Sequence, residues 1–147
     1  MNIKFCLAWA SGEVRKAFKS KASAELFHEF IGRIDKFDSC EAVRLEKEKK
    51  PATKVWICHT GKNAKMLSSE ALAESVQSLR NSGIKELRIL IGPADGFSSK
   101  EVEEMKPDFL WSFGPMTYPH DLAAVIAAEQ IYRAYTILHN FPYHKSH

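Results

Sequence analysis

The chain has 147 residues, of which 45% are hydrophobic and 27% are charged. This composition is typical of a folded globular domain and excludes a disordered, collagen-like or low-complexity chain. The formal net charge of +3 permits an anionic partner without requiring one. The longest apolar run, at 122–128, is shorter than the roughly 20 residues that span a membrane, and the N-terminal residues lack the apolar segment of a secretion signal. We therefore expect one domain, no membrane segment and a cytoplasmic location.

The first third of the sequence predicts strands separated by a long helix. Residues 2–10 alternate large and small apolar side chains, as in a strand that is covered on both faces. Residues 13–36 repeat apolar side chains at three- and four-residue spacing, which indicates a single helix. A short strand at 41–46 follows. The mixed charges at 46–50 indicate a solvated loop rather than a nucleic-acid patch.

The rest of the sequence alternates strands with helices. The expected elements are a strand at 54–59, a helix from the Ser68 cap to Gly83, a strand at 86–91, a short helix from Ser98 to Met105, a strand at 109–113 and a helix at 120–138. This order predicts an α/β fold with a mostly parallel sheet flanked by helices. Because ligands bind at the carboxyl ends of such strands, the candidate loops are those after residues 59, 91 and 113.

Two of these loops have sequences suited to a ligand. The loop at 91–96 (IGPADG) carries glycines that let a backbone approach a ligand, although it can also be a tight turn without one. It lacks the dinucleotide and P-loop fingerprints, which disfavours those nucleotide sites. The loop at 113–119 (FGPMTYP) contains two prolines and has backbone groups that need partners. Met116 and Tyr118 can wall a flat heteroaromatic such as adenine, unless the loop simply packs under the last helix.

Histidine and cysteine side chains are candidates for catalysis or metal binding. His120 opens the last helix beside Asp121, where it can cap the helix, contact a phosphate, relay a proton or serve a structural role. Cys6, Cys40 and Cys58 have no C-x-x-C spacing, which indicates reduced and packed thiols. Zinc needs at least one clustered pair of ligands, so we expect no metal.

The C-terminal residues mix aromatic and cationic side chains. Tyr143, His144, Lys145 and His147 follow Phe141. Such a mixture suits base stacking and phosphate contact in RNA. A frayed terminus often has the same composition, so both interpretations stay open.

The last third of the chain resembles a known enzyme family. The segments ELRILIGPADGFSS, FGPMTYPHDL and AAEQIYRAYTILHNFPYHK are similar, in this order, to the small SPOUT-class RNA methyltransferases that modify a pseudouridine of 23S ribosomal RNA at N3. A strand, G-K and S-S-E pattern at 55–70 extends the resemblance over nearly the whole chain, although it is dense only after residue 86. The resemblance implies one SPOUT-like methyltransferase domain over 1–147, with a C-terminal trefoil knot.

The resemblance also implies a cofactor, a substrate and a dimer. The enzyme would transfer a methyl group from S-adenosylmethionine to RNA of the large ribosomal subunit, and its active form would be a homodimer. The matching cofactor positions are Ile57, Gly92, Phe113, Gly114, Pro115, Met116, Thr117 and Tyr118. Tyr143, His144 and Lys145 would hold RNA. His120 would contact RNA or relay a proton, and Arg133 would be a structural or RNA-facing cation.

The chain departs from the family's pattern at several positions. Pro93 stands where a second glycine is usual, Ala124 where an arginine is usual, and Cys58 where an acid often follows the third strand. The segment between 46 and 54 is short, and a helix common in relatives is missing. Two alternatives therefore stay open: an RNA- or ribosome-binding protein that keeps the fold without turnover, and a methyltransferase for a small molecule.

Overall fold

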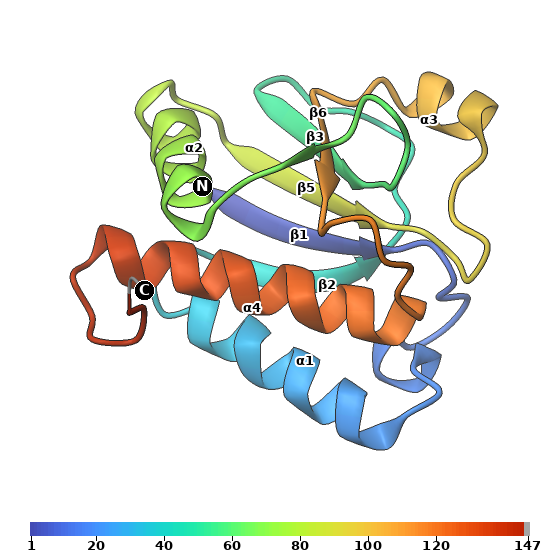
Figure 1. The fold of residues 1–147 in the computed structure, drawn as a ribbon, viewed down its shortest axis with the longest axis horizontal. Helices are drawn as coiled ribbons and strands as arrows, with labels where there is room; N and C mark the ends of the chain where they lie inside the picture. The colour runs from blue at the N-terminus through green and yellow to red at the C-terminus, as the bar shows by residue number, and fades with distance from the viewer. Residues whose placement is uncertain (146–147) are drawn as a thin grey trace.

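A computed structural model describes residues 1–145 as a six-stranded sheet with helices on both faces (Figure 1). Ser146 and His147 lie outside the described residues, and so does the expected role of His147. All neighbouring strands are parallel, in the order β2-β1-β5-β3-β6-β4. In chain order the elements are β1 (Asn2–Leu7), the 3-10 helix η1 (Val14–Ala17), α1 (Lys21–Ile34), β2 (Cys40–Arg44), β3 (Thr53–Cys58), β4 (Lys65–Met66), α2 (Ser69–Asn81), β5 (Glu86–Ile91), α3 (Ser99–Met105), β6 (Phe109–Ser112) and α4 (His120–Leu138). The expected α/β fold is confirmed.

Three helices cover one face of the sheet. α1, α2 and α4 pack against the apolar side chains that alternate residues of the strands direct to this face, and α1 and α4 lie side by side (Figure 1). Phe5, Ile89 and Ile131 are fully buried in this layer. Each such side chain contributes roughly 1.5–3 kcal/mol on burial, so this layer holds the main core of the protein.

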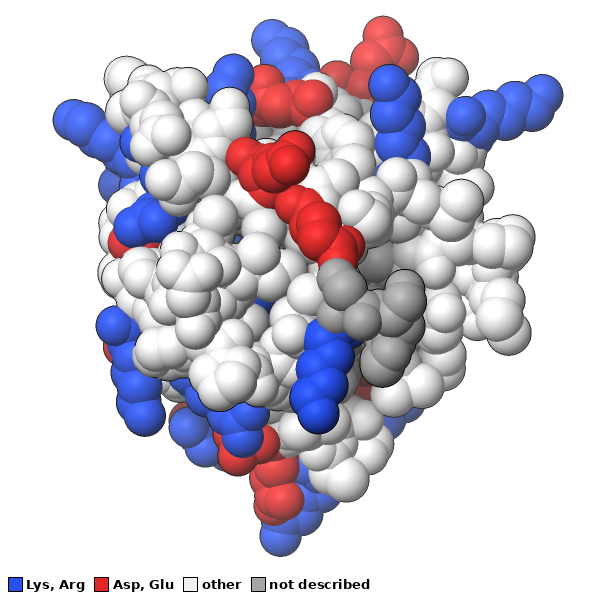
Figure 2. Space-filling view, turned by 60° about the vertical axis from the view of Figure 1, so that its left-hand side comes forward, with Lys and Arg blue, Asp and Glu red and all other residues white. Residues whose placement is uncertain are grey.

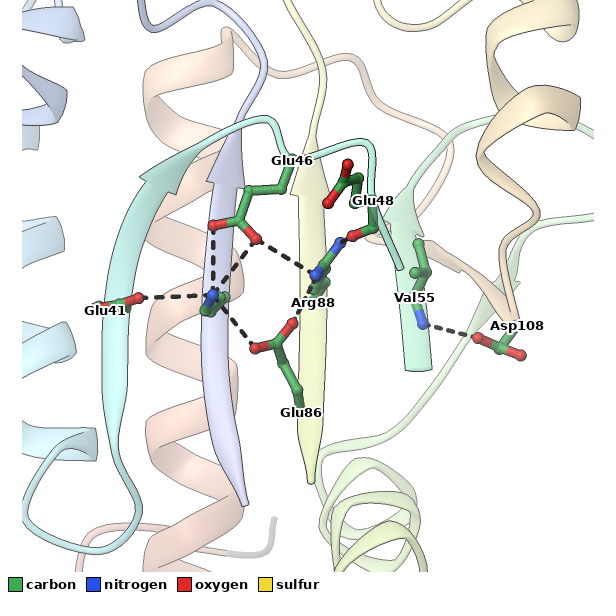
Figure 3. A network of polar contacts seen from close by, with 8 residues as sticks. Glu41, Glu46, Glu48, Val55, Glu86, Arg88 and Asp108 are labelled. Carbon is green, nitrogen blue, oxygen red and sulfur yellow. Dashed lines mark hydrogen bonds and ion pairs between the residues drawn. The ribbon is translucent and has the colours of Figure 1, made fainter. Parts of the chain in front are cut away.

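The opposite face of the sheet has a smaller apolar cluster and a group of charges. Short α3 packs there around Leu90 and Phe97. Beside this cluster, buried Arg88 pairs with Glu86 and with Glu46 of the loop that crosses the sheet (Figure 3). Every ionic group of this network therefore has a partner of opposite charge, as burial of charge requires.

Helix boundaries follow the capping residues of the sequence. The Ser68 hydroxyl accepts a hydrogen bond from the N–H of Ala71 at the start of α2. Ser98 and Glu101 form a reciprocal capping box at the start of α3. Gly83 follows α2 with φ +77°, a conformation that glycine adopts without a steric penalty. The expected caps at these positions are confirmed.

The helix predicted at 13–36 is wrong at its N-terminal end. The chain forms η1 at Val14–Ala17 and begins α1 only at Lys21. The side chain of Ser20 caps α1, while its backbone N–H donates to Oδ2 of Asp121 at 2.9 Å. A tertiary contact with α4 thus marks the start of α1, and local periodicity cannot reveal such a contact.

The edges of the sheet also differ from expectation. β1 ends at Leu7 instead of continuing to residue 10, and Trp9 lies in a turn. β4 was not predicted, because two exposed residues carry no periodic pattern; it pairs with β6 and widens the sheet. Within residues 1–145, no helix is long and apolar enough to cross a membrane.

Candidate functional site

The loops after β5, β3 and β6 surround a cavity at the carboxyl edge of the sheet. Its volume is about 310 Å³, which lies at the lower end of the range for small-molecule sites. The three strands are neighbours, so the loops that follow them meet. His120 and Ala123 of α4 complete the wall. The three candidate loops, those after residues 59, 91 and 113, thus all border this cavity.

Six of the eight predicted cofactor positions line this cavity. They are Gly92, Phe113, Gly114, Met116, Thr117 and Tyr118. Ile57 is fully buried and precedes Cys58, which does line the cavity. Pro115 belongs to the lining loop but does not itself border the cavity. The roles of all eight residues as cofactor contacts stay predictions.

One wall of the cavity is aromatic. The ring of Phe113 lies 4.9 Å from Trp111 and 6.5 Å from Tyr118, centroid to centroid. Met116 is 68% exposed at the rim. Aromatic rings and a polarizable thioether are suited to contact with a flat heteroaromatic ring.

A second wall is the tight turn that begins at Gly92. A Cβ at this position would lie 3.2 Å from Cδ2 of Phe97 and 3.3 Å from the backbone of Gly96. The N–H of Gly96 donates to the carbonyl of Pro93 at 2.8 Å, which closes the turn. Only a residue without a side chain fits Gly92 unless its neighbours move, so the sequence at this position fixes the shape of the wall.

His120 is buried in the wall of the cavity and is only 9% exposed. Its ring centroid lies 4.2 Å from that of Trp9. Nε2 lies 3.2 Å from Oδ1 of Asp121, but neither atom has a well-aligned hydrogen-bond partner within residues 1–145. The residue that caps α4 is Pro119, so the helix-capping alternative for His120 is wrong. Phosphate contact and proton relay stay predictions.

Cys58 supplies a neutral side chain to the cavity. Burial raises the pKa of its thiol far above the ordinary range, so it carries no negative charge at pH 7. The cysteines are free, as expected, and Cys6 and Cys40 are buried. Among the residues that the structure describes, no group of three or more His, Cys, Asp or Glu side chains could hold a metal ion.

The C-terminal residues that were predicted to hold RNA are docked on α4 and α2 of the same chain. The Tyr143 hydroxyl donates to Oε1 of Glu129 at 3.2 Å, and the Arg133 guanidinium lies 4.8 Å from the Tyr143 ring centroid. His144 accepts from Arg133 through Nδ1 at 3.1 Å and donates to Glu70 through Nε2 at 2.8 Å. Arginine can only donate and a carboxylate can only accept, so these contacts specify the tautomer with its proton on Nε2.

Arg133 is held inside this cluster. Its guanidinium lies 2.6 Å from Oε1 of Glu129, one turn earlier on α4. These contacts match the structural role expected for Arg133, and its RNA-facing role stays a prediction. Lys145 is exposed beyond the docked residues. None of the predicted RNA residues at 143–145 lines the cavity of its own chain.

Several residues of the cavity wall were not singled out from the sequence. They include His59, Thr60, Phe97, Trp111 and Ala123. His59 is the last residue of the strand predicted at 54–59 and Thr60 directly follows it, so their position at the carboxyl end of a strand could have nominated both. Trp9 was also missed, because the alternating pattern placed it within a strand rather than against His120.

Comparisons with known proteins agree on one family. A family model described as a predicted SPOUT methyltransferase matches residues 14–144. The protein named Ribosomal RNA large subunit methyltransferase H from Koribacter versatilis is 31% identical over 137 residues, which cover 88% of this chain and 92% of the relative. The protein of the same name from Magnetococcus marinus is 29% identical over 143 residues, covering 82% and 88%.

Two further matches are more limited. The protein of this name from Bartonella bacilliformis is 44% identical over 81 residues, which cover 55% of this chain and 49% of the relative. A solved structure of a putative methyltransferase from Legionella pneumophila, in complex with the bound cofactor SAM, aligns with 92% of this chain and 66% of that chain at 16% identity, with a TM-score of 0.48.

The parallel sheet, the cavity at its carboxyl edge and the match of the family model define the class of the protein. The chain belongs to the SPOUT methyltransferase family. Within this family it is similar to proteins named Ribosomal RNA large subunit methyltransferase H. The resemblance stated from the last third of the sequence is confirmed.

Proposed function

We propose that this protein transfers a methyl group from S-adenosylmethionine to N3 of a pseudouridine in 23S ribosomal RNA. Family membership and the relatives named Ribosomal RNA large subunit methyltransferase H support this function. The observation that carries it is the cavity that the Gly92 turn and the 113–118 loop line together. Its position is the one at which open α/β sheets bind ligands.

The residues around the cavity fit the chemistry of S-adenosylmethionine. Phe113, Met116 and Tyr118 would hold the adenine ring against apolar surface. Thr117 and Asp95 add a hydroxyl and a carboxylate to the lining, groups that can hydrogen-bond a ribose or an ammonium. The bound cofactor supplies an electrophilic methyl group. Because the Cys58 thiol is neutral, Asp95 is the acidic side chain of the lining that can attract a positively charged group.

His120 is the side chain to which we assign the handling of a proton. N3 of a pseudouridine carries a proton that must leave before the nitrogen can attack a methyl carbon. The ring of His120 borders the cavity, and its Nε2 lies 3.2 Å from Oδ1 of Asp121. Asp121 is itself held by the N–H of Ser20. The other contribution of the chain is to hold the base in a productive orientation.

We propose a homodimer as the active form. An α-helix rises 1.5 Å per residue, so Arg133 lies about 20 Å along α4 from His120 in the cavity wall. Tyr143 and His144 are docked beside Arg133, and a second copy would bring them to this cavity. On the side of the molecule turned forward in Figure 2, uncharged surface lies next to a row of acidic side chains. Exposed apolar side chains such as Phe141, which is 52% exposed, suit subunit contacts.

The same proposal includes three properties of the chain as a whole. Residues 1–147 form one methyltransferase domain, and their C-terminal part forms a trefoil knot. The protein works in the cytoplasm, where ribosomal RNA is modified.

Sedimentation of the purified chain tests the dimer, because a monomer at the concentration of the activity assay would contradict it.

Two measurements test the proposed reaction. Calorimetric titration with S-adenosylmethionine is expected to give binding for the unaltered chain and for Gly32→Trp, at an exposed helix position, and none for Gly92→Trp. Equal affinity in all three proteins would remove the site assignment. Labelled S-adenosylmethionine incubated with unmodified ribosomes is expected to label the RNA. RNA binding without label would instead support a binding protein without turnover, and methylation of a small molecule alone would support the third alternative.

A further inference from the structure

The segment that leads from β1 into the first residue of α1 carries the excess positive charge of the chain. Arg15, Lys16, Lys19 and Lys21 fall within seven residues, and all four are exposed. With Glu13 included, residues 13–21 have a net charge of +3, which equals the formal charge of the whole chain. The charges of all other residues therefore cancel. We call residues 13–21 the basic segment.

Contacts on its inner side hold the basic segment in place. Phe18 packs against Trp9 with ring centroids 5.9 Å apart. The backbone N–H of Ser20 donates to the Asp121 carboxylate at 2.9 Å. The apolar side chains of the segment thus face the protein, and its four cations extend from a fixed backbone into solvent.

These anchors connect the basic segment to the wall of the cavity. Trp9 lies against His120, which borders the cavity, and Asp121 is the next residue of α4. Figure 1 shows η1 at the carboxyl end of β1, beside the first turn of α4. The four cations are therefore at the same edge of the molecule as the proposed reaction site.

The cations are only weakly engaged within the chain. Lys16 lies 3.7 Å from Glu13, and both side chains are more than 70% exposed. Lys21 lies 4.0 Å from Glu25, again with both side chains at least 70% exposed. Exposed pairs of this kind contribute about 0–1 kcal/mol, so an anionic ligand can replace the carboxylates at little cost.

We propose that the basic segment binds the phosphate backbone of the RNA substrate and orients it toward the cavity. This inference rests on the proposed function, because it assumes that an RNA base is presented at the cavity. A row of four cations at close spacing matches a polyanion with a phosphate on every nucleotide. The segment positions the RNA and takes no part in the methyl transfer itself, since its lysines do not line the cavity.

The test compares two double variants with equal loss of charge. Lys16→Gln with Lys19→Gln removes two cations of the basic segment. The control, Lys36→Gln with Lys85→Gln, removes two exposed lysines at the amino edge of the sheet, opposite the cavity. Binding of the full chain to unmodified large ribosomal subunits is measured over a series of salt concentrations. Binding of S-adenosylmethionine is measured in parallel by calorimetry.

We expect the Lys16/Lys19 variant to bind the subunits more weakly. The slope of log affinity against log salt concentration should become less steep by about 1.4, or about 0.7 for each phosphate that is no longer neutralised. The control is expected to keep the slope, and both variants to keep their affinity for S-adenosylmethionine. If the slopes of both variants equal that of the unaltered chain while methylation is intact, the role of the basic segment is overturned and the proposed function stands. Absence of methylation by the unaltered chain would overturn the proposed function, and absence of subunit binding would overturn both.

Discussion

The indole ring of Trp9 lies against the imidazole ring of His120, with centroids 4.2 Å apart and planes inclined by 55°. Trp9 follows β1 and His120 opens α4, so the contact joins the first strand to the last helix beside the cavity. The indole Nε1 donates to the carbonyl of Ala17 at 2.9 Å, which ties η1 to the same place. One side chain therefore supports both the cavity wall and the basic segment.

Replacement of Trp9 by alanine is expected to loosen both structures. The substitution removes a large aromatic ring, and because Trp9 is only partly buried the free energy of unfolding should fall by about 2 kcal/mol, less than for a fully buried ring. Affinity for S-adenosylmethionine should fall as well, since His120 loses its support. Urea unfolding and calorimetry measure the two effects. Trp9→Phe keeps a ring against His120 and should retain most of the affinity; an alanine variant with unaltered affinity would contradict the supporting role.

The Gly92 turn gives a prediction with a matched control. Gly92→Ala places a Cβ 3.2 Å from Phe97 and 3.3 Å from the Gly96 backbone, so the turn must move, and we expect weaker binding of S-adenosylmethionine. Gly32→Ala adds a Cβ with no atom within 4 Å in the exposed part of α1. It should raise the free energy of unfolding by about 0.5–1 kcal/mol through helix propensity and leave binding unchanged. Equal binding by the two variants would show that the shape of the turn is irrelevant.

Local patterns in the sequence predicted most of the fold. α2, α3 and α4 begin at the residues expected from the sequence, and α2 ends before Gly83 as expected. Serine caps, Gly83 and the loop prolines are local signals, because each affects only the backbone of neighbouring residues. β5 has the expected bounds, because a fully buried strand reads as a continuous apolar run. The start of α1 was missed although the Ser20 hydroxyl caps it, because the apolar periodicity continues across this residue and the bond from the Ser20 N–H to distant Asp121 leaves no local pattern.

Of the candidate site, too, only a part could be predicted from the sequence. Gly92 and the 113–118 loop were predictable, because glycines and prolines after a buried strand mark irregular backbone at the carboxyl edge. Trp9 and the basic segment were not, since an alternating pattern placed Trp9 within a strand and helical periodicity concealed the break at Ser20. The docking of Tyr143 and His144 on Arg133 also depends on the tertiary path of the tail, which composition does not define.

The cysteines are expected to resist alkylation in the folded chain. Burial, with the nearby charge of Glu46, raises the pKa of the Cys6 thiol from 9.0 to about 12, so its thiolate at pH 8 is about a thousand times scarcer than that of an unperturbed thiol. The pKa values of Cys40 and Cys58 are raised as well, chiefly by burial. Iodoacetamide at pH 8, followed by mass spectrometry, should label all three cysteines in urea and almost none before unfolding. Rapid labelling of Cys58 in the folded chain would show that the cavity wall opens.

The charged network of Figure 3 gives a prediction of pH dependence. Burial alone would raise the pKa of Glu86, but hydrogen bonds and charges from Arg88 and Lys4 outweigh it and lower the pKa below 4.5. Glu86 therefore contributes stability that is present above about pH 4.5 and is lost as pH falls through its lowered folded-state pKa. Glu86→Gln leaves Arg88 without its 2.6 Å partner and should cost about 3 kcal/mol of unfolding free energy at pH 7.

The control for this network is Glu41→Gln. Glu41 is 60% exposed and lies 3.9 Å from Lys4, so its loss should change stability by less than about 1 kcal/mol. Urea unfolding at pH 7 and at pH 3 compares both variants with the unaltered chain. Because the stability that the charge of Glu86 contributes decreases as the pH falls below about 4.5, the difference caused by Glu86→Gln should be smaller at pH 3 than at pH 7. A difference of equal size at both pH values would mean that Glu86 acts through packing and not through its charge.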